Sequence, residues 1–478
     1  MTFDNSFTRR EFLKGAGALG AVSMTMWLGG CEACQEQIAH RPTRRNIANL
    51  AANDPIITAY QNAVTAMKAL PSTDPRNWTK QAQIHFDHCP HGNWWFLPWH
   101  RAYLSYFERI CRKLAGYNDF ALPYWNWTTS PSIPAVFWGN GNPLFDNTRG
   151  VGPSDQADPA WVGTTVIQNI LSTGNFNIFA SSPSSAPRGG TGGGYGELEA
   201  TPHNNIHSWI GGDMGAFMSP LDPVFWCHHN VLDCLWVEWN INRGNPNTND
   251  QNWYDLHMTE FVDENGQPVD VTVAATVLMP LFSYQFEPCG PAQEAPKKWQ
   301  RAQLEAFLKS GAPVRLDVTQ RMELKRAVTT EVGKPLASMA QLPADSLKTV
   351  LESQGKTAAL LTINGAQVPQ KTDFYVRVFT DKADASADTP ISDPHYAGSF
   401  GFFQDAKAMP GMEVMGSEAK QLGFVVDLTP TLKRLSDAGG MQGPAVNITL
   451  VLVPYEKRQA AGQTLTIEKL EFAIANVK

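Results

Sequence analysis

"CPHGNWWFLPWHRAYLSYFE", residues 89–108, surrounds two histidines with aromatic side chains and places a cysteine two positions before the first of them. Proline and glycine interrupt regular structure between His91 and His100, so we expect His91 on a loop. From His100 onward, apolar residues recur every three or four positions, which predicts a buried helix over 100–114. This stretch therefore predicts a helical fold with polar rings inside its core.

A second stretch, "VFWCHHNVLDCLWVEW" (224–239), has the same helical period, with Phe225, His229, Leu232 and Trp236 on one side. The stretch 181–196 between the two predicted helices is rich in Gly and Ser, which is typical of a long surface loop. We therefore predict a mainly α core domain, a helix bundle, over residues 31–290.

The pattern changes towards the C-terminus. β-branched, partly alternating runs separated by turn residues occupy 372–380, 422–428, 446–454 and 464–474. They predict an appended all-β sandwich domain over 341–478, joined to the core by a linker at 291–340.

Length, net charge and cysteine content limit the classes of function that fit the chain. The 478-residue chain is long enough for more than one domain, and its net charge of −7 comes without a concentrated basic stripe. Nucleic acid is therefore not expected as a partner. The seven cysteines are too few and too irregularly spaced for a disulfide framework, although one or two bridges remain open.

Eight of the eleven histidines fall into two short windows. His203 and His207 stand at i and i+4, which places both imidazoles on one helix face. His229 lies inside a predicted buried helix, where its ring nitrogens need partners. His91 and His100 are nine positions apart, about 180° on a continuous helix, so they cannot share one helix face.

Two sets of three imidazoles without a thiolate or carboxylate pattern favour copper over zinc or calcium. His85, six residues before His91, could complete the first set, while His203, His207 and His229 offer the second.

"HGNWWFLPWHRAYLSYFE" and "DPVFWCHHNVLD" resemble the two copper signatures of the tyrosinase, catechol oxidase and molluscan haemocyanin family. The resemblance implies two copper ions that bind dioxygen between them. It assigns His85, His91 and His100 to one copper, with His85 preferred over His88, and assigns His203, His207 and His229 to the second. His228 is then interpreted as a core histidine.

The same resemblance implies roles for further residues. Cys89 would be joined through sulfur to His91, with a small buried hydrophobe as the alternative. Asp233 would support His229 from outside the ligand set. A glutamate four residues before the first ligand of the second copper, here Glu199, and the asparagine directly after that ligand, here Asn204, would orient a water for monophenol hydroxylation.

Three further matches concern the ends of the domains. The stretches at 44–46 and 282–284 resemble the arginine and tyrosine motifs that close the core domain of the family. "PHYAGSF" (394–400) resembles a stretch in the C-terminal domain of plant polyphenol oxidases, which covers the copper site. The C-terminal domain is therefore expected to act as a shielding domain.

The first thirty residues resemble a bacterial twin-arginine export signal, with "TRREFLK" before a short apolar run. "LGGC", ending at Cys31, resembles a lipoprotein processing site, which makes a lipid anchor there an open alternative. We therefore expect export to the periplasm or the extracellular space.

The expected function is oxidation of phenols and o-diphenols to o-quinones with dioxygen as co-substrate. A tailoring oxidase acting on an o-aminophenol or a peptide-borne tyrosine is an alternative, and an oxygen carrier resembling haemocyanin is a less favoured one. Small phenolic molecules are the expected partners.

Overall fold

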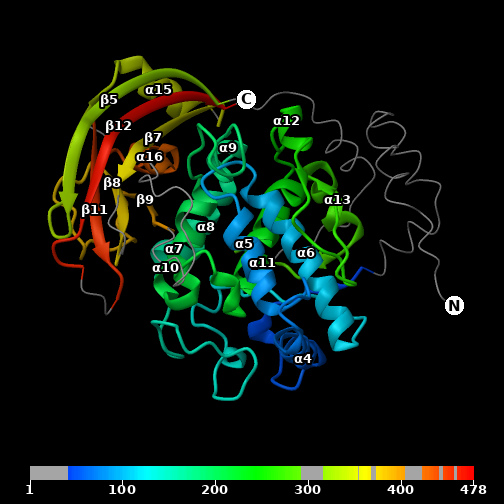
Figure 1. Cartoon of the computed structure of the whole chain (residues 1–478). Helices are drawn as coiled ribbons and strands as arrows, with labels where there is room; N and C mark the ends of the chain where they lie inside the picture. The colour runs from blue at the N-terminus through cyan, green and yellow to red at the C-terminus, as the bar shows by residue number, and fades with distance from the viewer. Residues whose placement is uncertain are drawn as a thin grey trace.

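The computed structural model describes residues 41–291, 316–353, 355–367, 373–403, 422–440, 445–456 and 460–477. Figure 1 shows two parts, a helical region (41–291) and a β region (316–477). The predicted export signal and the predicted lipid site at Cys31 lie outside the described residues. Among the helices that are described, none has the length and apolar character needed to cross a membrane.

Helix α6 (Phe96–Ala115) lies at the centre of the helical region and packs most extensively against three other helices. These are α4 (Pro55–Ala69), α11 (Val224–Val237) and α13 (Val273–Phe282). Nearly all of α6 before its last turn is buried, which explains its unbroken apolar and aromatic sequence.

Helix α6 begins four residues earlier than predicted. Pro98 lies in its first turn, where a backbone N–H has no partner within the helix, so the missing donor costs nothing there. The helix ends at Gly116, whose φ of 63° is the left-handed conformation that glycine adopts without strain. His100 is therefore in the second turn of α6 and is held rigidly by it.

The β region consists of two antiparallel four-stranded sheets. One has the order β10-β7-β12-β5 and the other β6-β11-β8-β9. The strands of the first are β5 (Leu316–Glu331), β7 (Thr357–Gln367), β10 (Leu422–Asp427) and β12 (Thr464–Val477). Those of the second are β6 (Leu336–Gln341), β8 (Phe374–Thr380), β9 (Tyr396–Phe400) and β11 (Ala445–Pro454). One apolar cluster draws on both sheets, for example on Ile363 and Leu450.

The predicted linker over 291–340 is wrong in its second half, because β5 and β6 lie there. β5 alternates between half-buried and exposed positions along most of its length, and one face packs on the sheet. Its outward side chains are mostly polar or charged, so the stretch has few of the apolar runs that identified the other strands. The β region therefore begins at Leu316 among the described residues.

The two ends of the helical region meet. β1 (Thr43–Arg44) pairs in parallel with β4 (Gln285–Phe286), and the guanidinium carbon of Arg44 lies 3.5 Å from the centre of the Tyr284 ring. The predicted arginine and tyrosine motifs thus lie together. A disulfide between Cys234 and Cys289, which the sequence left open, joins α11 to the segment after β4.

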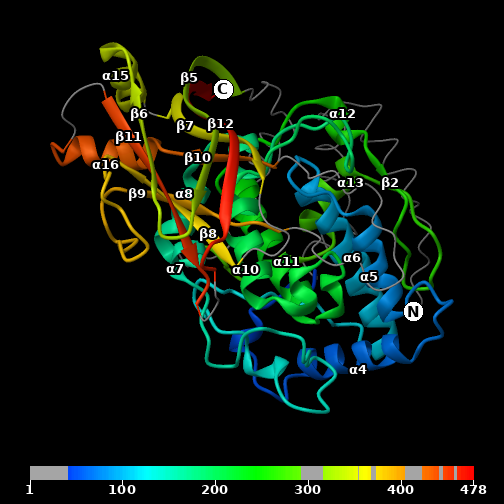
Figure 2. The same ribbon diagram turned by 60° about the vertical axis from the view of Figure 1, so that its left-hand side comes forward.

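The β region packs on the segment that carries His203 and His207. Figure 2 shows β8 and β9 beside α7 (Pro159–Val162) and α10 (Asn204–Ile210). The backbone N–H of Gly401 donates to the carbonyl of Ala200 (2.8 Å), and the hydroxyl of Tyr455 donates to Asn205 (2.8 Å). These buried bonds fix the β region against the histidine-bearing helix.

Candidate metal centre

The first histidine set is His85, His91 and His100. His85 lies in the last turn of α5 (Trp78–His88), His91 on the loop that follows and His100 on α6. Their ring centres are 5.3 to 5.5 Å apart, and all three side chains are buried. His88 is exposed, so the geometry favours His85 for this set.

The second histidine set is His203, His207 and His229. His203 ends a π-helical turn (Glu199–His203), His207 follows on α10 and His229 comes from α11. Their ring centres are 4.5 to 5.3 Å apart, and all three are buried. His228 lies beside this set: its Nδ1 accepts a hydrogen bond from Trp127 (3.2 Å), while its buried Nε2 has no hydrogen-bond partner among the described residues.

The two sets face each other across one buried site. The ring centres of His91 and His203 are 5.4 Å apart, and those of His100 and His229 are 4.4 Å apart. Aromatic side chains close the walls, with Phe96 4.6 Å from His100 and Phe225 4.1 Å from His229. The site is therefore dry except where a ligand or substrate enters it.

Hydrogen bonds at Nδ1 fix the tautomer of four of these rings. The Nδ1–H of His85, His100 and His207 donates to a backbone carbonyl, those of Phe217 (2.6 Å), Phe96 (2.8 Å) and Met214 (2.7 Å) respectively. The Nδ1–H of His203 donates to Asn204 Oδ1 (2.9 Å). Because a carbonyl only accepts, each Nε2 is left with its lone pair for a metal.

All six imidazoles of the two sets are neutral. Burial lowers the pKa of His100 and of His207 to about 3, and lowers those of the other four as well. The Nε2 atoms of His85, His100 and His203 are buried and have no hydrogen-bond partner among the described residues. Buried neutral imidazoles with open lone pairs cost free energy unless a cation binds them, and copper suits an all-imidazole site.

Glu199 and Asn204 lie at the join between the two sets. Glu199 is buried and accepts hydrogen bonds from the backbone N–H of Gly92 (2.8 Å) and from the Ser181 hydroxyl (2.6 Å). Asn204 accepts from His203 and donates to the carbonyl of Gly401 (3.0 Å). Glu199 thus connects the loop of the first set to the turn that carries the second.

Cys89 lies beside the second member of the first set. Its Sγ is 3.3 Å from Nδ1 of His91 and 3.9 Å from the guanidinium of Arg188. Cys89 is buried, at the C-terminal end of α5. The predicted pair of Cys89 and His91 is therefore brought together by the loop.

The predicted contact of Asp233 with His229 is corrected by the structure. Asp233 Oδ1 accepts from Arg101 (2.6 Å), and Oδ2 accepts from Arg44 (3.1 Å) and from the Tyr284 hydroxyl (2.5 Å). Asp233 lies one helical turn beyond His229, so it meets the closing strands of the region and not the imidazoles. It anchors α11 in the core through buried ion pairs.

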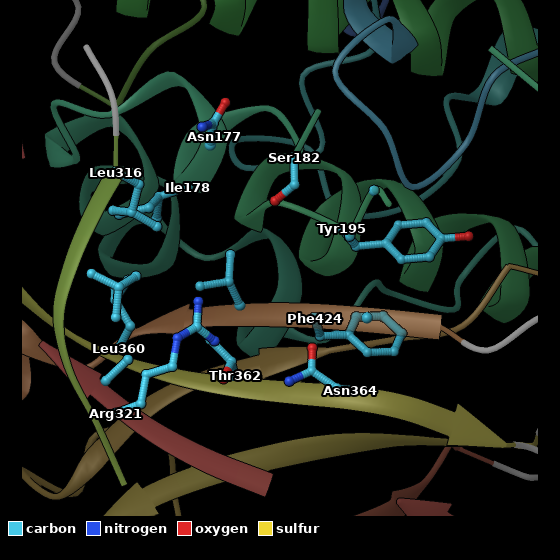
Figure 3. Close-up of a pocket in the computed structure, with 16 residues that line it drawn as sticks. Asn177, Ile178, Ser182, Tyr195, Leu316, Arg321, Leu360, Thr362, Asn364 and Phe424 are labelled. Carbon is cyan, nitrogen blue, oxygen red and sulfur yellow. The ribbon is translucent and has the colours of Figure 1, made fainter. Parts of the chain in front are cut away.

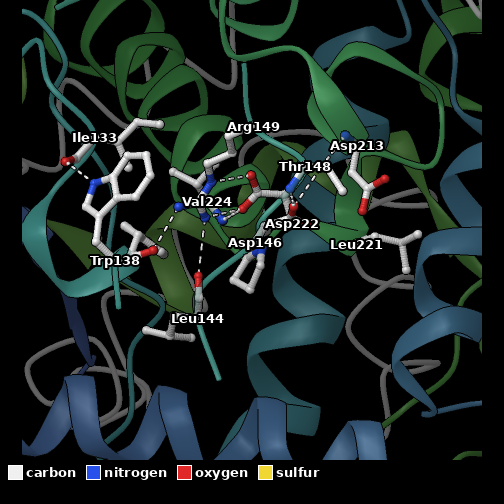
Figure 4. A network of polar contacts seen from close by, with 12 residues as sticks. Ile133, Trp138, Leu144, Asp146, Thr148, Arg149, Asp213, Leu221, Asp222 and Val224 are labelled. Atoms are coloured by element: carbon white, nitrogen blue, oxygen red, sulfur yellow. Dashed lines mark hydrogen bonds and ion pairs between the residues drawn. The ribbon is translucent and has the colours of Figure 1, made fainter. Parts of the chain in front are cut away.

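A second network of hydrogen bonds, shown in Figure 4, fixes the start of α11. It also fixes the turn that carries Met214, whose carbonyl accepts from His207. Arg149 makes two hydrogen bonds to Asp222 (2.6 and 2.7 Å), which in turn accepts from the first N–H of α11, that of Val224 (2.9 Å). Thr148 accepts from the N–H of Asp213 (2.9 Å), next to the residue whose carbonyl holds His207. This loop positions both helices of the second set.

Phe403, from the β region, covers the site, and no residue-level signal pointed to it. Its ring centre is 4.3 Å from that of His207 and 5.0 Å from that of His91. It also lies 5.2 Å from Phe217, whose ring stacks on His91. The match at 394–400 ended three residues before this side chain, which is buried against the histidines.

The comparisons with known proteins agree with this site. The model of the common central domain of tyrosinase matches residues 62–191 and 148–242. The tyrosinase HcTyr1 of Hahella sp. (strain CCB-MM4) is 27% identical over 87% of this chain and 96% of that protein. The chloroplastic polyphenol oxidase II of Ipomoea batatas is 28% identical over 87% of this chain and 74% of that protein.

Solved structures share the fold. A latent aurone synthase (polyphenol oxidase) matches 92% of this chain and 90% of its own with a TM-score of 0.70 at 23% identity. Latent apple tyrosinase matches 91% of this chain and 98% of its own with a TM-score of 0.68 at 22% identity. The matched central domain and the relatives, taken with the histidine site, support an oxidoreductase of the polyphenol oxidase type.

Proposed function

We propose that the protein holds two copper ions, one in each histidine set, and oxidises phenols and o-diphenols to o-quinones. The observation that carries this proposal is the pair of facing sets of neutral, buried imidazoles. Copper supplies, when bound, the redox chemistry with dioxygen. Two o-diphenols and one dioxygen give two o-quinones and two waters, so no further co-reactant is needed.

The protein's own residues prepare the site for this chemistry. The Nδ1 bonds hold four of the six rings in the orientation that a metal needs, and Phe96 and Phe225 exclude bulk water from the space between the rings. Phe403 occupies the place where a phenol ring would approach His207. The β region thus restrains activity until it moves.

Glu199 and Asn204 are proposed to handle a proton. A monophenol must lose its hydroxyl proton before it can be hydroxylated, whereas a diphenol is oxidised by loss of electrons and protons alone. Glu199 is a buried acceptor beside the second set, where it accepts hydrogen bonds from the Gly92 N–H and the Ser181 hydroxyl. A water held by this pair would take the proton.

Asn204→Asp is expected to lower the monophenol rate about tenfold or more while the diphenol rate falls less, because only the first needs the proton acceptor. The ratio of the two rates is measured in oxygen-uptake assays, and it is independent of how far the β region covers the site. Asn147→Asp, at an exposed position, is the matched control. Equal losses on both substrates would show that the pair does not select the reaction.

Cys89 is proposed to be bonded through sulfur to a ring carbon of His91. The bond replaces the S–H and one C–H, so two hydrogens leave and dioxygen accepts two electrons. Beyond the two hydrogens lost to the disulfide, copper-matured protein should therefore be two hydrogens lighter than its sequence mass. Cys89→Ser should abolish this further difference in intact-mass spectra. Cys111→Ser, which changes another buried thiol, should leave it in place. Recovery of alkylatable Cys89 from active enzyme contradicts the bond.

Oxygen uptake by the copper-loaded protein tests the proposed function against its alternatives. The assay compares a monophenol, an o-diphenol, an o-aminophenol and a tyrosine-containing peptide. Fastest consumption with the diphenol supports the proposal, and fastest consumption with the aminophenol or the peptide assigns the tailoring reaction instead. An oxygen carrier whose histidine site is covered by Phe403 is the remaining alternative. Such a protein would bind oxygen reversibly without consuming it.

A further inference from the structure

A cavity separate from the histidine site lies where the two regions meet. Figure 3 shows Asn177, Ile178 and Ser182 of the helical region on one side of it and Arg321, Leu360 and Thr362 of the β region on the other. Its volume is about 160 Å³. None of the histidines lines it among the described residues.

The cavity has the size of one aromatic ring. An apolar protein cavity of about 150 Å³ is known to hold benzene. Ile178, Leu360 and Phe424 form apolar walls, and Phe424 is itself stacked on Tyr195 with ring centres 5.1 Å apart. Walls of this kind favour a flat apolar ligand over a hydrated ion.

Polar side chains that line the cavity make fewer hydrogen bonds than they could. Arg321 is the one charged residue among the described residues that line it, and its side chain is 56% exposed at the edge. Its guanidinium forms an ion pair with Glu471 at 3.7 Å, a distance too long for a hydrogen bond. Glu471 is instead bound by Lys469 (2.7 Å) and Asn364 (3.0 Å). The five N–H donors of Arg321 therefore make no hydrogen bond within the described part of the chain.

Thr362 provides a second, independent sign of a missing partner. Its Oγ1 is buried in the cavity wall and has no hydrogen-bond partner among the described residues. A buried hydroxyl without a partner costs free energy, which a ligand oxygen placed beside it would recover. Thr362 lies two positions from Leu360 on β7, so its side chain and that of Leu360 face the same side of the sheet.

We propose that this cavity is a second ligand site, which binds a single-ring aromatic carboxylate. The ring would lie between Ile178, Leu360 and Phe424, and the carboxylate would accept hydrogen bonds from Arg321, whose planar fork matches it. Since the bound molecule touches both regions, it stabilises their association and with it the position of Phe403 over the histidines. The site is independent of the copper chemistry proposed above.

The test is a titration of the full chain with 4-fluorobenzoate followed by ¹⁹F NMR. We expect saturable binding, with a dissociation constant that rises about tenfold or more in Arg321→Gln, because the charge-assisted hydrogen bonds are lost. Leu360→Phe, which fills the cavity, should weaken binding by a similar factor. Arg326→Gln is the matched control, since Arg326 is also on β5, is 63% exposed and pairs with Glu323 outside the cavity.

Repeating the titration with neutral 4-fluorotoluene separates the contribution of the ligand's aromatic ring to binding from that of its carboxylate charge. The neutral compound should bind at least about tenfold more weakly. Three outcomes would overturn the proposal. These are no saturable binding to the wild-type chain, an unchanged dissociation constant in both cavity variants, or equal binding of the neutral compound. Circular dichroism of each variant verifies that the fold is intact.

Discussion

His100→Ala and His207→Ala are each expected to reduce the copper content from two ions to one per chain and to lower oxidation of an o-diphenol by at least about 100-fold. The physical reason is that each ring offers a neutral Nε2 whose orientation is fixed by an Nδ1 bond. Changes outside the ligand set already cost such sites about 10- to 100-fold, so loss of a ligand should cost at least as much.

Metal analysis by mass spectrometry and oxygen uptake on the same samples measure the two effects. His257→Ala is the matched control, because His257 is 61% exposed and its ring pairs with Asp270. Full activity in either ligand variant, or a single zinc per chain in the wild type, contradicts the two histidine sets as copper sites. Unchanged thermal unfolding of the metal-free variants would show that the fold does not depend on these rings.

Phe403→Ala is expected to raise the turnover of bulky phenols about tenfold or more. A ring centre 4.3 Å from that of His207 occupies the volume that a substrate ring needs, so removing it opens the site while the rest of the β region stays in place. Rates are measured on the copper-loaded full chain with a bulky phenol and with catechol.

A graded series makes this prediction sharper. Phe403→Leu keeps part of the apolar cover, so its rate should fall between those of the wild type and the alanine variant. The gain should be larger for the bulky phenol than for catechol, because the smaller ring needs less of the vacated volume. A wild-type rate in Phe403→Ala, at full copper content, would contradict the shielding role of the β region.

The sequence predicted which imidazoles lie close together. Histidine spacing and aromatic surroundings singled out six rings, and the fold brings all six into one buried space. This worked because helical periodicity determines which side chains share a face, and because buried imidazoles need a partner. Strands rich in β-branched residues, such as β8 and β11, were also found where the period-2 pattern predicted them.

The features that the sequence missed depend on contacts between distant segments. Asp233 lies on the same helix as His229, yet its partners come from β1, α6 and the residue before β4, which local spacing does not reveal. The cover by Phe403 and the disulfide of Cys234 depend in the same way on how separate parts of the chain pack. β5 was missed because polar side chains on its outer face weaken the strand pattern.

The parallel pairing of β1 with β4 has a consequence for the timing of synthesis. Because this pairing joins residues 43–44 to 285–286, the helical region has all its strands and helices once about 290 residues have left the ribosome. Phe403 follows roughly 110 residues later, which is about 5–20 s at elongation rates of about 5–20 residues per second. During each round of translation the histidine site therefore passes through an interval in which it is assembled and uncovered, and metal can reach it before the cover has been made.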